Sequence, residues 1–395
     1  MSSWLRRPSW PALTWVGVLV IALIAAVVSA VNSDAANTDV RTASNPPNIP
    51  PGPLGEQLSE LWQSGSATDD QRTVASNTVI TSSEHGVRGL DPSTGEERWH
   101  YLRTNATMCD LTVLDDVVVA IFRTTERCNE AIALEAGSGL RRWYRNVGFS
   151  DQLSLLGSGT AALAATPGGI AVLDACGNSI RWRYNPPQGC ELSSIGIGTN
   201  GVVVLESCVT GTRWLAEFEL YSGEQQWRVA PPPGDVTVLG ADGVVSLLVG
   251  QQLTILSARD GTLLSTLPTT IESSGPPESA AMLLGGQADG RGVPLVYLAG
   301  VLHAFDPATG VLLWSVSATG LPASNDVGLV VPEAGAFVTR DAVTGAEIAR
   351  SVVLGETGSP DGSSGGPGAS SGPTRIEQAG SALIAVTPDG LVGYG

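Results

Sequence analysis

Acidic side chains recur at a fixed spacing along the chain, and they are the first residues whose types could support chemistry. Each is followed four positions later by Gly or Asn, and in five copies a Trp stands eight positions after the acid. The acids are Asp91, Glu135, Asp174, Glu219, Asp306 and Asp341. Carboxylates can act as general acids or bases. Because an acid in a Gly-containing turn can accept hydrogen bonds from the turn amides, we interpret these carboxylates as structural.

Other catalytic signatures are weak. We expect His85, His100 and His303 to occupy different blades and radial positions, so neither a catalytic triad nor a metal cluster is expected from them. The sequence contains no HExxH pattern and no Gly-rich phosphate loop ahead of a helix. We therefore assign no catalytic, cofactor-binding or metal-binding residue.

Four of the five cysteines form two similarly spaced pairs. Cys109 and Cys128 flank one two-strand segment at a separation of 19, and Cys190 and Cys208 flank another at a separation of 18. In each pair the first Cys begins one strand and the second ends its antiparallel neighbour, so the two can face each other. We predict two disulfides, which suit an oxidising compartment. Cys176 is left over as a buried or free thiol.

The charge balance excludes one class of partner. The chain has 38 acidic and 21 basic residues, a net charge of −17, and every basic residue is Arg. Such a chain repels a phosphate backbone, so we expect no nucleic-acid binding.

The N-terminal region predicts a membrane anchor and a spacer. Residues 10–31 carry no charge and are long enough to span a bilayer, and the two Arg before them place residues 1–9 in the cytoplasm. The remainder is then extracytoplasmic, at the cell membrane. A cleaved signal peptide is the alternative. Clustered Pro makes residues 32–57 a predicted extended stalk.

The repeat itself indicates the elements that position these side chains. A strand enters a Gly turn, the next strand carries the Trp, and two further strand-like runs complete a period of about 41 residues. We expect each repeated Trp to pack between neighbouring units. These residues are Trp62, Trp99, Trp143, Trp182, Trp227 and Trp314.

The two ends of the repeat region predict how it closes. The last copy stops at Gly395 before any Trp, and the region begins with a lone strand that carries Trp62. Residues 58–395 are therefore predicted to be an all-β, eight-bladed β-propeller of four-stranded blades closed by N- and C-terminal strand exchange, with seven blades as the alternative. Residues 356–373, rich in Gly, Ser and Pro, predict a disordered loop.

The skeleton of an acid, TG and Trp resembles the PQQ-like (quinoprotein alcohol dehydrogenase-like) β-propeller repeats. Its best copies are LDPSTGEERW at 90–99 and FDPATGVLLW at 305–314. The resemblance implies the propeller fold. Quinoprotein enzymes that share it bind PQQ and calcium beneath two adjacent Cys, and this chain has no adjacent Cys. Non-enzymatic relatives, such as the lipoprotein BamB, use a similar propeller as an interaction scaffold.

These observations predict a non-enzymatic function. We expect a membrane-tethered extracytoplasmic scaffold that binds proteins of the bacterial envelope, or a ligand, on a propeller face. One alternative is a quinoprotein-type oxidoreductase with PQQ and calcium. A further alternative is a sensor of small molecules or wall glycans, which would use the acidic loops and Trp214, the one Trp outside both the repeat and the anchor region.

Overall fold

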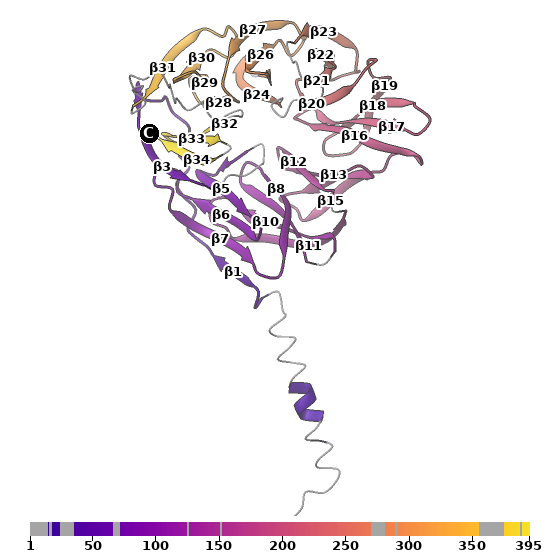
Figure 1. The fold of residues 1–395 in the computed structure, drawn as a ribbon, viewed down its shortest axis with the longest axis vertical. Coiled ribbons are helices and arrows are strands. Elements are labelled where there is room, and N and C mark those ends of the chain that lie inside the picture. Colours follow the sequence, from indigo (N-terminus) through magenta and orange to yellow (C-terminus); the bar gives the residue numbers. More distant parts are fainter. Residues whose placement is uncertain are drawn as a thin grey trace, which may run out of the picture.

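The computed structural model describes residues 15, 18–23, 35–65, 72–124, 126–150, 152–269, 281–288, 291–354, 375–387 and 389–395. Within them, the strands form eight sheets arranged as blades around an axis (Figure 1). Six sheets have four strands, and two gain a fifth from the N-terminal segment. The predicted eight-bladed propeller is therefore confirmed.

Each blade runs from an innermost strand at the axis to an outermost strand at the rim. Blade 1 contains β4 (Val74–Ala75), β5 (Thr78–Ser83), β6 (Gly86–Leu90) and β7 (Glu97–Arg103). Blade 2 contains β8 (Thr107–Val113), β9 (Val117–Arg123), β10 (Cys128–Glu135) and β11 (Arg141–Phe149). Blade 3 contains β12 (Ser154–Ser158), β13 (Ala161–Thr166), β14 (Gly169–Asp174) and β15 (Ser179–Tyr184). Blade 4 contains β16 (Cys190–Ile197), β17 (Gly201–Cys208), β18 (Arg213–Glu219) and β19 (Gln225–Val229).

The second half of the ring repeats this order. Blade 5 contains β20 (Val236–Asp242), β21 (Val244–Val249), β22 (Gln252–Ser257) and β23 (Leu263–Pro268). Blade 6 contains β24 (Ala281–Ala288), β25 (Arg291–Leu298), β26 (Val301–Phe305) and β27 (Leu312–Ser317). Blade 7 contains β28 (Ala323–Ser324), β29 (Leu329–Glu333), β30 (Ala336–Arg340) and β31 (Glu347–Val353). Blade 8 contains β32 (Arg375–Ala379), β33 (Ala382–Thr387), β34 (Gly390–Tyr394) and β3 (Glu60–Ser64).

The hydrophobic cores lie between the blades. In β9, whose sequence is VVVAIFR, six of the seven residues are buried. Val119 and Ile121 belong to one core, and Val118 and Phe122 belong to another. Since successive side chains of a strand point to opposite faces, both faces of the blade must be apolar. This explains why these strands lack the apolar–polar alternation of a half-exposed sheet.

The ring closes by strand exchange between the two ends of the chain. β3 pairs antiparallel with β34, with Trp62 opposite Gly393. Ser59 and Gly395 exchange two backbone hydrogen bonds of 3.0 and 3.1 Å, which replace the turn found at this place in the other blades. With β3 in place, blade 8 has four strands and no open position in its sheet.

Each repeated Trp joins its blade to the turn of the next blade. Its indole Nε1 donates to the backbone carbonyl of the residue after the turn acid or its Ser equivalent, at 2.7–3.0 Å. The pairs are Trp62–Pro92, Trp99–Ala136, Trp143–Ala175, Trp182–Leu220, Trp227–Ala258 and Trp314–Ala342. Each repeated Trp therefore lies between blades, as expected, and also donates a hydrogen bond that holds neighbouring blades in register.

The glycine of the motif completes this contact between blades. Gly139 adopts a φ of +71°, and a Cβ at this residue would lie 2.6 Å from the ring of Trp99. Only Gly meets both requirements without strain. The acid, the Gly and the Trp of the motif are therefore parts of one joint between two blades.

A β-bulge precedes the Trp position in every outermost strand. In β7, for example, Gly89 is opposite Trp99 and Leu90 is opposite Glu97, which leaves Arg98 as the extra residue. The same shift occurs in the other seven blades. We call the extra residue the bulge residue. A bulge increases local twist and turns its side chain away from the ladder.

The stalk predicted for residues 32–57 is wrong from residue 38 onward. β1 (Thr38–Arg41) pairs with β7 at the rim of blade 1, and β2 (Gln57–Leu58) pairs with β31 of blade 7. The Pro-rich residues 42–56 between them, here called the strap, lie on the propeller. An extended Pro-rich chain keeps its carbonyls available as acceptors, which allows it to dock on a surface instead of projecting from it.

The predicted membrane anchor and the predicted Gly/Ser/Pro-rich loop fall on residues that are mostly not described. The anchor at residues 10–31 lies mostly outside the described residues, and so does the loop near residues 356–373. In the part of the chain that is described, no helix is both long and apolar enough to cross a membrane.

Candidate functional site

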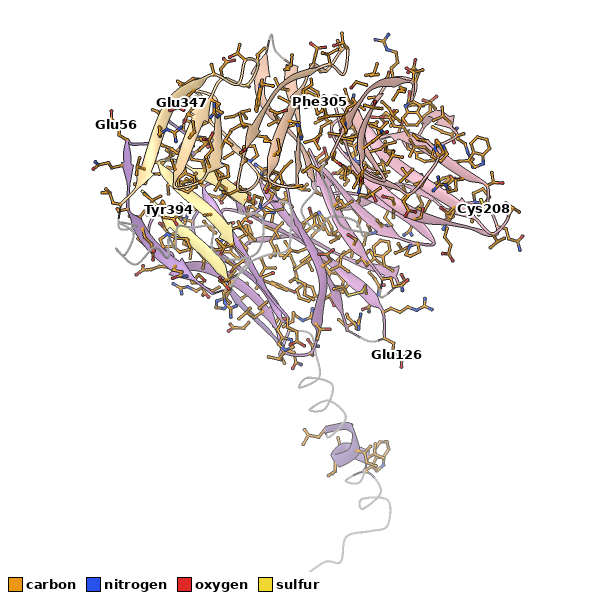
Figure 2. The ribbon with its side chains drawn as sticks, turned by 45° about the horizontal axis from the view of Figure 1, so that its top comes forward. Glu56, Glu126, Cys208, Phe305, Glu347 and Tyr394 are labelled. Carbon is orange, nitrogen blue, oxygen red and sulfur yellow. A yellow bond between two sulfur atoms is a disulfide. The ribbon has the colours of Figure 1, made fainter. Side chains whose placement is uncertain are left out.

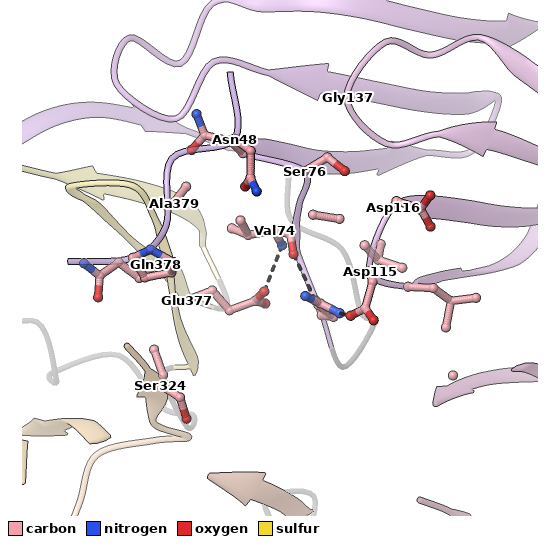
Figure 3. A pocket seen from close by; sticks show the side chains of 18 of the residues that line it. Asn48, Val74, Ser76, Asp115, Asp116, Gly137, Ser324, Glu377, Gln378 and Ala379 are labelled. Carbon is pink, nitrogen blue, oxygen red and sulfur yellow. Dashed lines mark hydrogen bonds and ion pairs between the residues drawn. The ribbon is translucent and has the colours of Figure 1, made fainter. Parts of the chain in front are cut away.

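A cavity of about 880 Å³ lies at the axis of the propeller. The turns that follow the innermost strands β4, β8, β12 and β32 line it, together with residues of blades 5 and 7. Part of the strap, including Asn48 and Pro51, forms one wall (Figure 3). The cavity therefore opens on the face that carries the repeat turns, beneath the strap.

Glu377, on innermost strand β32, links blade 8 to blade 1 beside the cavity. Its two carboxylate oxygens accept hydrogen bonds from the amides of Thr73 and Val74, at 2.5 and 2.8 Å (Figure 3). Arg375 lies 3.3 Å from Oε1. Burial raises the pKa of Glu377, although Arg375 and the two amides oppose the shift. This carboxylate closes the ring on its inner side, as Trp62 does on its outer side.

The same arrangement recurs at other contacts between innermost strands. Asp110 of β8 accepts a hydrogen bond of 2.7 Å from the amide of Leu155 in blade 3. Ser194 of β16 accepts one of 2.9 Å from the amide of Val238 in blade 5. The inner polar side chains thus satisfy backbone donors that the short innermost strands leave unpaired.

The mouth of the cavity carries paired charges of both signs. Arg72 lies 2.6 Å from Asp115, and Arg142 lies 2.6 Å from Asp116 and 3.6 Å from Glu135. A surface of neutralised pairs and amides is suited to polar, uncharged groups. It does not favour a strongly charged small molecule.

The strap is held over this mouth mainly through its backbone carbonyls. Gly52 O accepts hydrogen bonds from Gln378 Nε2 at 2.6 Å and from Asn325 Nδ2 at 3.3 Å. Nearer its start, Ser44 O accepts one from Arg98 at 3.0 Å. The propeller face therefore recognises an extended polypeptide by side-chain donors from blades 1, 7 and 8.

Replacing Gln378 with Ala is predicted to loosen the strap without unfolding the propeller. The change removes the 2.6 Å hydrogen bond to Gly52 and the contact with Asn325. We expect amide exchange across residues 49–56 to rise by about fivefold, since one net hydrogen bond contributes about 1 kcal/mol. Hydrogen-exchange mass spectrometry measures this. Unchanged exchange in the strap would show that Gln378 does not hold it.

The turn acids lie away from the cavity axis, except that Glu135 reaches its rim. Asp341 Oδ1 accepts hydrogen bonds from the amides of Thr344 and Val343, at 2.7 and 3.1 Å. The hydrogen bonds from Thr344 hold the pKa of Asp341 below its usual range. Similar bonds from turn groups occur at the other turn acids, namely Asp91, Glu135, Asp174, Glu219 and Asp306. Each acid is positioned to stabilise its own turn.

Both predicted disulfides are confirmed. Cys109 is bonded to Cys128 in blade 2, and Cys190 is bonded to Cys208 in blade 4. Figure 2 shows Cys208 at the periphery of the molecule. None of the four disulfide cysteines lines the cavity. Cys176 is an exposed free thiol in the Asp174 turn.

Trp214 has a structural partner that the sequence did not indicate. The guanidinium of Arg228 lies over its ring, 5.1 Å from the centroid. Arg228 is in turn paired at 2.5 Å with Glu206, which is fully buried. Because Arg228 covers one face of Trp214, this arrangement favours packing over ligand stacking.

Glu217 is a buried carboxyl within blade 4. Only 1% of its surface is exposed, and burial raises its pKa to about 7 from 4.5. A raised folded-state pKa stabilises the fold at pH below 4.5, and this contribution is lost as the pH rises through 7. At pH 8 the loss is on the order of 3 kcal/mol.

Glu217→Gln should therefore make the protein more stable at pH 8 by about 2–3 kcal/mol, with little change at pH 5. Urea unfolding at the two pH values measures the difference. If the variant and the wild type show the same pH dependence, Glu217 does not titrate as described.

Comparison with known proteins places the fold in a family. The family model described as "Outer membrane protein assembly factor BamB" matches residues 56–262, just over half of the chain. The chain belongs to this family. The matched segment of this BamB-family propeller runs from the end of the strap to the last turn of blade 5. No curated protein sequence matches this chain.

Solved structures resemble the BamB-family propeller over most of its length. The computationally designed Ika8 protein shares 15% identity, with a TM-score of 0.55 over 86% of this chain and 99% of its own, which supports the propeller fold. BamB from Moraxella catarrhalis shares 18% identity, with a TM-score of 0.46 and coverages of 85% and 99%. The C-terminal WD40 domain of Sif2 shares 8%, with a TM-score of 0.49 and coverages of 87% and 99%.

The cavity of the BamB-family propeller does not fit PQQ with calcium. None of the described residues that line it is aromatic, so no ring is available to stack on a planar quinone. The nearby carboxylates Asp115, Asp116 and Glu377 are already engaged by Arg side chains or backbone amides. His85 and His100 both lie in blade 1, so the expectation that the three His occupy different blades is wrong for this pair. The described residues contain no group of His, Cys, Asp and Glu suited to a metal ion. We derive no redox step from this site.

Proposed function

We propose that this chain is a membrane-tethered, extracytoplasmic β-propeller that binds other proteins of the bacterial envelope as a scaffold. Membership of the BamB family supports a protein-binding propeller. The two disulfides are consistent with an oxidising compartment outside the cytoplasm. The uncharged residues 10–31 are long enough to act as the tether.

The observation that carries the proposal is how the propeller binds its own N-terminal segment. Two of its rim strands each accept an added strand, β1 on β7 and β2 on β31. Its turn face holds the strap through carbonyl hydrogen bonds. Addition of a strand to a sheet edge and docking of an extended Pro-rich segment are two of the recurring modes by which a folded domain recognises a segment of another protein.

The test is co-purification from the native host. The tagged full-length chain is crosslinked in intact cells, and the proteins bound to it are identified by mass spectrometry. The control carries Trp99→Ala, which weakens the ring. One dominant envelope protein, lost in the control, supports the scaffold; the same background from both chains contradicts it.

A ligand in the axial cavity is a second candidate function. The cavity volume of about 880 Å³ and its amide-rich, charge-paired mouth suit a polar, uncharged molecule such as a glycan fragment. Titration of the purified chain with neutral N-acetylglucosamine oligosaccharides and with PQQ plus calcium, followed by calorimetry, separates this function from the quinoprotein alternative. Heat from the oligosaccharides alone supports the glycan sensor.

A further inference from the structure

The bulge residues divide the rim of the propeller into two chemically different halves. Blades 1 to 3 place Arg at this position, and blade 4 places Gln. Blades 5 to 8 place an aliphatic residue there instead. The residues in blade order are Arg98, Arg142, Arg181, Gln226, Leu264, Leu313, Ile348 and Leu61.

Blade 6 has the longest run of apolar residues next to its bulge residue. Its run Val311, Leu312, Leu313 is 56%, 36% and 38% exposed, and it continues into the half-buried Trp314. In every other blade at least one of the three residues before the Trp position is charged or polar. A run of exposed apolar residues at a place where the other copies are polar points to a function.

The exposed apolar surface extends onto blade 7. The indole of Trp314 donates to Ala342 O at 3.0 Å, which brings the neighbouring turn against β27. Val343 in that turn is 38% exposed, and Ile348 just beyond it is 48% exposed. We call this surface, formed by Val311, Leu312, Leu313, Val343 and Ile348, the rim patch.

No strand among the described residues pairs with the outer edge of β27, and its sequence offers little protection against pairing. β27 is the terminal strand of its sheet, at the outer rim in Figure 1, and its sequence LLWSVS contains no charge. The terminal strands β11, β15 and β19 carry Arg, and β23 ends at Pro268. Charges and Pro are the usual protections of an open edge, and β27 has neither.

Two other outermost strands, β7 and β31, already accept an added strand although both carry charged residues. On blade 7, next to the rim patch, β2 adds to β31 with Gln57 opposite Val352. On blade 1, β1 adds to β7 through four residue pairs. Both occupants are short extended segments. A second copy of the chain is a poorer occupant, because each copy carries a net charge of −17.

We propose that the edge of β27 and the rim patch together bind an extended segment of another protein, with alternating apolar residues, as a fifth strand of blade 6. The added strand pairs with the backbone of β27, and its apolar side chains cover Leu313 and Val343. This inference rests on the proposed scaffold function and names the surface that performs it.

Leu313→Arg is the variant that separates binding from folding. Arg already occupies the same bulge position in blades 1, 2 and 3, so the fold accommodates it. The matched control is Val209→Arg, which places the same charge on a residue that is 91% exposed in blade 4. We expect all three chains to have the same circular dichroism and melting temperature.

The experiment uses the full-length chain in its host, with a benzoyl-phenylalanine photo-crosslinker in place of Leu312. The protein captured is purified, and its binding to wild type, Leu313→Arg and Val209→Arg is measured by interferometry. Amide exchange of residues 312–317 in the wild-type chain is then measured with and without the captured protein. We expect Leu313→Arg to weaken binding at least tenfold, Val209→Arg to bind as wild type, and the amides to gain at least tenfold protection.

The other outcomes overturn the inference in distinguishable ways. Equal binding by Leu313→Arg, or unprotected amides in β27, places the partner elsewhere and leaves the scaffold function standing. Crosslinks between two copies of the chain show that the rim patch is a dimer contact. Capture of no protein by the wild type overturns both the inference and the proposed function.

Discussion

Trp99→Ala is expected to destabilise the propeller by about 3–5 kcal/mol, the range for a fully buried large aromatic side chain. Trp99 is 0% exposed, donates to Ala136 O at 2.9 Å and packs against Gly139 of the next blade. The substitution removes the ring and leaves the carbonyl without its donor. Equilibrium unfolding in urea measures the loss.

Trp214→Ala is the matched control for this prediction. Trp214 lies in the same fold but contacts Arg228 at a partly exposed site, so we expect a loss of about 1 kcal/mol. A Trp99→Ala variant within about 1 kcal/mol of wild type would show that the joint between blades is not what holds the ring together.

Arg103→Met is expected to cost about 3–5 kcal/mol, because it removes the cation that neutralises a buried carboxylate. Arg103, at the end of β7, is 1% exposed, and it forms an ion pair with Glu130 of β10, which is 3% exposed. A hydrogen bond of 3.0 Å to Asn105 further orients the guanidinium. The pair joins blades 1 and 2 in the interior. Urea unfolding again provides the measurement.

A second substitution separates the charge effect from lost packing. Arg103→Met combined with Glu130→Leu removes both charges, and we expect it to recover most of the stability, since apolar replacement of a whole buried pair is often neutral. Arg350→Met, at an exposed pair with Glu347, should leave the stability almost unchanged, because water screens this pair. A double variant as unstable as Arg103→Met would contradict this account.

The number of blades and their closure could be predicted because the information is local and repeated. Asp91, Gly95 and Trp99 lie within nine residues, and each residue type is required by a turn or by a joint between blades. The disulfides were predictable for the same reason, since each pair lies within one blade. Cys190 begins β16 and Cys208 ends its neighbour β17 as expected, whereas Cys128 begins β10 instead of ending β9. Repetition turns a weak local signal into a strong one.

The docking of the strap and the contact between Glu377 and blade 1 could not be predicted, because the residues that meet there are distant in the chain. Gly52 is held by Gln378, and Thr73 by Glu377, at separations of 326 and 304 residues. No sequence pattern near residues 42–56 distinguishes a docked Pro-rich segment from a free spacer. The rim patch could not be predicted either. The repeat aligns Leu313 with Arg98 in the sequence, but only the structure shows that this residue is left out of the strand ladder and exposed.

The central claim, that this BamB-family propeller is a protein-binding scaffold, is tested most directly by the affinity of the purified full-length chain for the envelope protein that crosslinks to it. We predict a one-to-one complex with a Kd of about 1 μM or tighter, weakened at least tenfold by Leu313→Arg. Absence of saturable binding at about 100 μM of the purified partner would contradict the scaffold function.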